Sequence, residues 1–332
     1  MAVKYSPLEY LYASSRIRAM EVRLVGRERL AALADTGTYG DAVAFLETLV
    51  SAPVRSGDGA VDTERTLQAY LKAELDAVLG VLPDRCLAAL VQYPYDCHNI
   101  KSYLKARARG ISPEDLLLDT GSVPTERLLL AFSTEDFSAL PPAMAAAIDA
   151  AKRSFAKTAD PREIDFLLDV ACFADMKEAV TGLPFAERVL GTRADLINLL
   201  TALRLLRLGN ASIAPLLFEK VALGVGTLSA TEIRAEVEKG EDALLAYLSR
   251  TPYHTVFAKA RAERLSAVEK RADDHLTRVV QTAKSVPFGA EVAVAYLLAL
   301  DASVRNLRIL LAAKASGASV ATLKERLRES YV

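Results

Sequence analysis

The chain has few cysteines and few histidines, and neither residue type is arranged for a site. Among its 332 residues there are three cysteines, with no Cys-x-x-Cys spacing and no even-numbered framework: Cys86, Cys97 and Cys172. This usage is typical of free thiols in a reducing compartment. The three histidines lack the spacing of metal ligands. The sequence therefore predicts neither a disulfide framework nor a metal site.

Phosphate-binding loops are also missing. The chain has no Gly-x-x-x-x-Gly-Lys-Ser/Thr motif and no Gly-x-Gly-x-x-Gly motif. The segment "GVGTLS", from Gly224 to Ser229, is weakly similar to a nucleotide loop, but no strand precedes it and no lysine follows. We expect it to be a loop between helices, and we expect no bound cofactor.

Long apolar runs are absent as well. The longest clean runs are about the length of "VAVAYLLAL", which lies between Glu291 and Asp301. A membrane span needs roughly 20 apolar residues. The first twenty residues contain no apolar core of a signal peptide. We therefore expect a cytoplasmic protein without a membrane span, which could still dock peripherally on a membrane complex.

Neither sign of charge is in excess. Lys and Arg total 41 against 42 Asp and Glu, for a net charge of −1. A dedicated nucleic-acid binder would carry a strongly basic face, so the balance argues against nucleic acid as a partner. Hydrophobic residues make up 52% of the chain, which is enough for a large core and, on length alone, for two or three domains.

The residues that are present favour helices. Ala, Leu, Glu, Arg and Lys dominate, and the apolar/polar alternation of strands is scarce. We expect an all-α protein. The segment 254–285 contains neither Gly nor Pro and carries an apolar stripe at helical spacing, so it predicts one long amphipathic helix.

A pattern occurs three times along the chain. The stretches "DCHNIKSYLKARARG", "DLINLLTALRLLRLG" and "SVRNLRILLAAKASG" align without a gap. Each has Asp or Ser, then Asn three residues later, then Gly eleven residues after the Asn: Asp96, Asn99 and Gly110; Asp195, Asn198 and Gly209; Ser303, Asn306 and Gly317. Similar units of about one hundred residues would account for the chain. We place them at residues 1–118, 119–218 and 219–332.

The repeated residues suggest a structural role. Asp and Ser are good N-cap residues, so each stretch could be a helix of about 12 residues that begins there. Alternatively, the Asp or Ser could lie inside a longer helix, especially around Ser303, where the apolar periodicity continues on both sides. The Asn could bond back or across to a neighbouring helix. Each glycine stands where a left-handed residue would end the helix.

Cys97 and His98 lie side by side in the first copy and raise the possibility of a thiol enzyme. Adjacent helical residues point about 100° apart, so they do not easily form a nucleophile–base pair. The same two positions hold Leu196 and Ile197 in the second copy and Val304 and Arg305 in the third. A thiol enzyme is the least favoured hypothesis, and we predict no catalytic residue.

The repeated stretches are basic. Residues 97–113, 196–218 and 302–324 contain no acid. Cations favour helix C-termini and could pair with acids on neighbouring helices, which is the simpler interpretation. Alternatively, three related basic helices could meet an acidic partner. The candidate partner-facing residues are Lys101, Arg107, Arg204, Arg305 and Arg308.

Together these residues resemble a known family. The resemblance rests on "YLYASSRIRAMEVRLV" near the start, the triple unit, and the closing run from "PFGAEVAVAYLLALD" to "ESYV". They are similar to the C subunit of bacterial and archaeal V/A-type ATPases (ATP synthases), whose counterpart in the eukaryotic V-ATPase is the d subunit. The resemblance runs from about Tyr5 to Val332. The second copy departs from the others, because Leu200 stands where they have Lys101 or Arg308.

The resemblance implies three homologous helical domains in a funnel around a pseudo-threefold axis. It implies a non-catalytic rotor component of the central stalk, between the D and F subunits and the membrane proteolipid ring (c, K or L type), which transmits torque. Such a component is cytoplasmic and peripheral on the membrane. The alternative is a helical repeat scaffold or adaptor outside any ATPase, although solenoid repeats usually have periods of about 20–50 residues.

Overall fold

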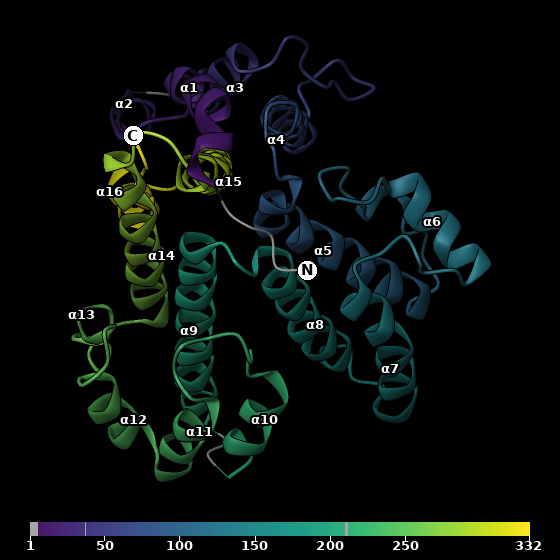
Figure 1. The fold of residues 1–332 in the computed structure, drawn as a ribbon, viewed down its shortest axis with the longest axis vertical. Helices are drawn as coiled ribbons and strands as arrows, with labels where there is room; N and C mark the ends of the chain where they lie inside the picture. The colour runs from purple at the N-terminus through teal and green to yellow at the C-terminus, as the bar shows by residue number, and fades with distance from the viewer. Residues whose placement is uncertain (1–5, 37, 210–211) are drawn as a thin grey trace. The chain divides into compact units, whose positions relative to one another are not determined.

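A computed structural model describes residues 6–36, 38–209 and 212–332, and the start of the family resemblance at Tyr5 lies outside them. The described residues form sixteen α-helices and five short 3₁₀ helices (Figure 1), and they contain no β-strand beyond one isolated antiparallel bridge between Arg55 and Val61. The prediction of an all-α protein is confirmed. No helix in this part of the chain is long and apolar enough to cross a membrane.

The chain divides into two compact units. The terminal unit combines the described residues from Ser6 to Val91 with Thr277–Val332, and the central unit is Gln92–Leu276. The expected division into 1–118, 119–218 and 219–332 and the funnel arrangement stay predictions.

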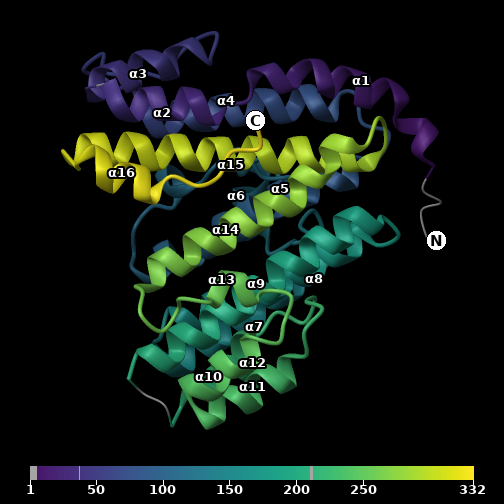
Figure 2. The ribbon, with the colours of Figure 1, turned by 90° about the vertical axis from the view of Figure 1, so that its left-hand side faces the viewer.

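The terminal unit is built around one long helix. Its helices are α1 (Leu11–Met20), α2 (Arg27–Thr36), α3 (Tyr39–Thr48), α4 (Thr63–Leu79), α15 (Ala290–Ala315) and α16 (Val320–Arg326). Helix α15 contacts α1, α2, α3, α4 and α16, and Figure 2 shows it running beside α16. Residues 292–300 of α15 are each at most 8% exposed. The longest apolar run of the sequence is therefore a core helix, which is apolar on all sides because other helices surround it.

A buried acid ties α15 to α4. Glu74 of α4 accepts a hydrogen bond from the hydroxyl of Tyr296 at 2.8 Å, and Arg23 donates to its other oxygen at 3.2 Å. Buried charges need such partners, since an unpaired carboxylate would have to be desolvated without compensation. The pKa of Tyr296 is raised by burial and by the neighbouring carboxylate.

The central unit contains the remaining helices. They are α5 (Ala89–Ala108), which begins just before the unit, α6 (Thr125–Thr134), α7 (Pro142–Thr158), α8 (Arg162–Val180), α9 (Pro184–Arg207), α10 (Ala214–Val221), α11 (Ala230–Lys239), α12 (Glu241–Leu248), α13 (His254–Phe257) and α14 (Leu265–Gln281), which ends just after it. Helices α7 and α8 pack along one another. Asp175 of α8 accepts bonds from the backbone N–H groups of Ala143 and Met144, both at 2.8 Å, and so satisfies the first turn of α7. Leu199 and Leu203 of α9 pack in a buried cluster with Phe218 and residues of α11–α14.

The predicted long helix over 254–285 is wrong. Helix α13 ends at Phe257, α14 begins at Leu265, and a 3₁₀ turn covers Thr282–Ser285. Arg207 donates to the carbonyl oxygens of Ala260 at 2.5 Å and Glu263 at 3.1 Å. Arg271 donates to the carbonyl oxygen of Val256 at 2.8 Å. These guanidinium groups take the role of hydrogen-bond donor to carbonyls that backbone N–H groups would bond in a continuous helix. The helix can therefore be interrupted although the segment contains no Gly or Pro.

Candidate functional site

The repeated motif lies in the interior of three long helices. Asp96 is in α5, Asp195 in α9 and Ser303 in α15, all well past the helix start. The N-cap interpretation is therefore wrong, and the alternative of a longer helix is correct for every copy. All three helices end two residues before the repeated glycine, which has positive φ: 69° at Gly110, 79° at Gly209 and 66° at Gly317. These are left-handed C′ positions, which favour glycine.

The side chain of each repeated asparagine makes two hydrogen bonds to the backbone of a single residue in a later segment. Its side-chain N–H₂ donates to a carbonyl and its side-chain oxygen accepts the N–H of the same residue. The pairs and the two distances are Asn99 with Leu118, 2.8 and 2.8 Å; Asn198 with Leu223, 3.0 and 2.8 Å; Asn306 with Arg328, 3.2 and 2.9 Å. We call this arrangement the asparagine clamp. It satisfies a backbone N–H and a backbone C=O that would otherwise be partly or fully buried without a partner.

In the first copy an aspartate extends the clamp. The carboxylate of Asp96 accepts bonds from the Ser122 N–H at 3.1 Å, the Ser122 hydroxyl at 2.5 Å and the Val123 N–H at 3.1 Å. The loop after α5 is thus fixed at two points, one held by Asn99 and one by Asp96. The pKa of Asp96 is raised to about 6 because the carboxyl is buried, although the bonds from Ser122 and Val123 oppose the rise.

The second copy repeats this geometry on α9. The carboxylate of Asp195 accepts the Thr227 N–H at 3.1 Å, the Leu228 N–H at 3.0 Å, the Thr227 hydroxyl, and in addition the hydroxyl of Tyr253 at 2.8 Å. Burial and the bond to Asp195 raise the pKa of Tyr253. The segment "GVGTLS" is thus an interhelical loop held on a carboxylate.

Each aspartate requires a glycine in the loop that it holds. A Cβ atom on Gly121 would lie 2.2 Å from Oδ1 of Asp96, and one on Gly226 would lie 2.1 Å from Oδ1 of Asp195. Both separations are far inside van der Waals contact. The loops therefore share the sequence Gly, then Ser or Thr, then an apolar residue. Sequence reasoning identified the segment around Gly226 as a loop but did not connect it with the repeat, although the triplet shared with residues 121–123 was a visible signal.

The third copy lacks the carboxylate. Ser303 is buried, and its hydroxyl donates to the carbonyl oxygen of Ala299, one turn back in the same helix, at 2.8 Å. Only the asparagine clamp is retained there, through Asn306. The repeat is therefore strongest at the Asn, and the Asp position serves a loop that only the first two copies hold.

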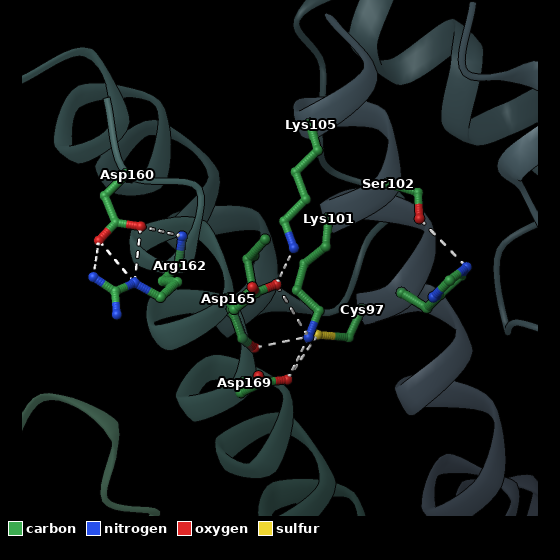
Figure 3. Close-up of polar contacts among 10 residues, drawn as sticks. Cys97, Lys101, Ser102, Lys105, Asp160, Arg162, Asp165 and Asp169 are labelled. Atoms are coloured by element: carbon green, nitrogen blue, oxygen red, sulfur yellow. Dashed lines mark hydrogen bonds and ion pairs between the residues drawn. The ribbon is translucent and has the colours of Figure 1, made fainter. Parts of the chain in front are cut away.

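Two lysines of α5, the helix that carries the first copy of the motif, face α8. Lys101 lies 2.7 Å from Oδ1 of Asp169 and 3.8 Å from Oδ1 of Asp165, and Lys105 lies 2.5 Å from Asp165 (Figure 3). These partners belong to the same unit of the same chain. Lys101 thus makes the type of contact expected from the simpler interpretation of the basic stretches.

The other candidate partner-facing residues differ in their surroundings. Three of them pair with acids: Arg204 with Glu269 at 2.5 Å, Arg305 with Asp301 at 3.2 Å, and Arg308 with both carboxylate oxygens of Glu64 at 2.7 and 2.8 Å. Arg107 is exposed and makes no ion pair within the described residues. A partner-facing role for any of the five stays a prediction.

Cys97 and His98 do not form a catalytic pair. The Cys97 thiol is buried and donates to the carbonyl oxygen of Leu168 at 3.5 Å. His98 is exposed, and its Nε2 lies 3.3 Å from the hydroxyl of Ser102, on the same helix. Across 6–36, 38–209 and 212–332, no three metal-ligating side chains come together.

Comparison with known proteins identifies the family. The model of the ATP synthase (C/AC39) subunit family matches residues 13–326. The C subunit of the A-type ATP synthase of Pyrococcus abyssi is 24% identical over 98% of this chain and 91% of its own length. The C subunit of the V-type sodium ATPase of Enterococcus hirae is 22% identical over 98% and 99% of the two chains, and that of the V-type ATP synthase of Thermus thermophilus is 24% identical over 91% and 93%. The chain belongs to the ATP synthase (C/AC39) subunit family, whose members are accessory rather than catalytic subunits of the ATPase complex.

Proposed function

We propose that this chain is a central-stalk component of a V/A-type rotary ATPase, which links the shaft of the D and F subunits to the membrane proteolipid ring and transmits torque between them. The observation that carries the proposal is the family match, which extends over residues 13–326 and therefore over nearly the whole chain. The relatives named above also align over most of their length. A scaffold protein that shared only one segment with the family would match the family model over that segment alone.

The clamps support a mechanical role. A torque coupler should deform little, and connecting loops are usually the most mobile parts of a helical protein. Here Asn99 and Asp96, and again Asn198 and Asp195, bond backbone groups of the following loop to a buried point of a long helix. The loops are therefore held by the same helices that build the core, which restricts bending between successive helices.

The charge distribution suggests which residue meets a partner. Lys101, Arg204, Arg305 and Arg308 already pair with acids of this chain, so binding through them would first require breaking those pairs. Arg107 is exposed near the end of α5 and makes no such pair within the described residues. We propose Arg107 as the motif-helix residue that contacts an acidic partner surface.

Reconstitution tests the bridging role directly. The purified chain is mixed with the D–F pair, with the detergent-solubilised proteolipid ring, and with both, and each mixture is run on a sizing column at low and high salt. The proposal expects a complex with each partner and a larger complex with both. A well-folded chain that binds neither partner would contradict it and would favour a scaffold outside the ATPase.

A charge-reversal pair tests the contact through Arg107. Arg107→Glu should weaken one of the two complexes and reduce the salt dependence of its formation, because a surface attraction becomes a repulsion. Lys157→Glu is the matched control, since Lys157 is an exposed cation in the last turn of α7, outside the repeated motif. Equal affinities for the two variants would remove Arg107 from the interface without affecting the bridging role.

A further inference from the structure

The central unit contains a cavity that no part of the proposed function uses. It has a volume of about 520 Å³ and lies among α5, α8, α9 and α10. Apolar side chains make up much of its wall, among them Phe166, Ile197 and Leu217. A cavity of this size admits a small organic molecule. Two cysteines, Cys97 and Cys172, also line it.

These two cysteines come from different helices and line the same cavity. Cys97 of α5 is 2% exposed and Cys172 of α8 is 3% exposed. The sulfur of Cys97 lies 3.5 Å from the carbonyl oxygen of Leu168, which is one helical turn before Cys172 on the same helix. Both cysteines are free. A helical side chain lies over the turn that precedes its own Cα, so the Cys172 side chain lies over the turn of Leu168, beside the sulfur of Cys97.

Two charged side chains, Asp169 and Lys101, lie next to the sulfur of Cys97. Oδ1 of Asp169 lies 3.7 Å from the sulfur of Cys97 and 2.7 Å from Nζ of Lys101 (Figure 3). The neighbouring Cys172 thiol and burial raise the pKa of the Cys97 thiol, so Cys97 keeps its proton. Cys172 is therefore the better candidate for the first attack on an incoming reagent, with Cys97 as the thiol that completes the bond.

We propose that Cys97 and Cys172 form a reversible disulfide site, which a low-molecular-weight disulfide reaches through the cavity and which, when oxidised, joins α5 to α8. Neither the family relationship nor the proposed rotor function requires this chemistry.

The reaction consumes one molecule of oxidant, RS–SR. The Cys172 thiolate attacks one sulfur of the oxidant, a mixed disulfide forms, and the first RS⁻ leaves and takes up the proton that Cys172 lost. Cys97 then gives up its proton and attacks the Cys172 sulfur, so that the second RS⁻ leaves and is protonated. Two hydrogens and two electrons pass from the protein to the oxidant, which becomes two RSH.

The test uses the folded full-length chain carrying Cys86→Ser, because Cys86 is half-buried and could react separately. The protein is incubated with oxidised glutathione, then denatured, and its free thiols and intact mass are measured. We expect the thiol count to fall from two to zero, a mass loss of two hydrogens, and a Cys97–Cys172 cross-linked peptide in a non-reducing digest. Dithiothreitol should reverse all three changes. If Cys86→Ser fails to fold, the same digest of the unmodified chain gives the answer.

Single variants separate the two steps. Cys97→Ser in the same background should accumulate a glutathione adduct on Cys172, whereas Cys172→Ser should react at least tenfold more slowly. Two results would overturn the proposal: both thiols persist in the folded protein while denatured protein is oxidised, or each cysteine forms only its own glutathione adduct without a cross-link.

Discussion

The sharpest consequence of the clamp geometry concerns Gly226. Replacing it with alanine adds one methyl group at a point where the carboxylate of Asp195 already stands, with Cβ 2.1 Å from Oδ1. Gly224→Ala, two residues earlier in the same loop, is a matched control, because a Cβ there has no heavy atom within 4 Å. Both variants add the same methyl group to the same loop, but only the one at Gly226 places it against Asp195.

The cost follows from the bonds that the methyl group displaces. Real Cβ contacts below 3.0 Å are essentially never observed, so the loop or the carboxylate must move by about 0.9 Å. The N–H groups of Thr227 and Leu228 are 3.1 and 3.0 Å from the Asp195 oxygens, so a shift of this size breaks or greatly weakens both bonds. Hydrogen bonds to a charged group are worth about 1.5–3 kcal/mol each. We expect Gly226→Ala to lower the free energy of unfolding by about 3–5 kcal/mol, and Gly224→Ala to change it by less than about 1 kcal/mol.

Urea unfolding followed by far-ultraviolet circular dichroism gives the stability difference. Hydrogen exchange with mass spectrometry then localises it, and amides of residues 223–229 should exchange faster in Gly226→Ala while those of the other clamped loops do not. Gly121→Ala should act in the same way on the Asp96 loop, where the corresponding separation is 2.2 Å. A Gly226→Ala protein as stable as Gly224→Ala, with unchanged exchange in this loop, would refute the clamp as a source of rigidity.

Three further predictions concern other contacts. Asn198→Ala leaves two buried backbone groups of the held loop unsatisfied and should lower the free energy of unfolding by about 2–5 kcal/mol. Asn306→Ala should lower it by less, because the partner residue of Asn306 is half-buried and open to water. The urea midpoints of the two variants test this difference. The folded-state pKa of Asp96, about 6 against an ordinary 3.8, means that its contribution to stability is full below about pH 4 and is lost as the pH rises through 6. Relative to Asp96→Asn, the unchanged chain should therefore lose about 2 kcal/mol between pH 4 and 7, and parallel pH profiles would contradict this. Arg207→Met should cost about 2 kcal/mol and accelerate hydrogen exchange around Ala260 and Glu263, whose carbonyls Arg207 holds; unchanged exchange there would assign the break before α14 to another cause.

The sequence by itself determined the class of fold and the location of the repeat. Helical composition and the absence of strand alternation act over a few residues, so they can be recognised locally, and the helices match them. The same is true of Gly110, Gly209 and Gly317, because a left-handed residue after a helix is a local requirement. The family, too, was recognisable from the motif and the closing run, and the match over residues 13–326 confirms it.

Only the tertiary structure decided what the repeated residues do. Asn99, Asn198 and Asn306 bond to residues 19, 25 and 22 positions further along the chain, and no fixed spacing marks those partners. Asp96 looked like a helix start because an Asp before an apolar run has that local meaning, yet its carboxylate serves a loop that returns to the helix interior. The break between α13 and α14 depends likewise on Arg207, more than fifty residues earlier. Local preferences can be read from neighbouring residues, whereas a hydrogen bond between distant segments exists only after the chain has folded back on itself.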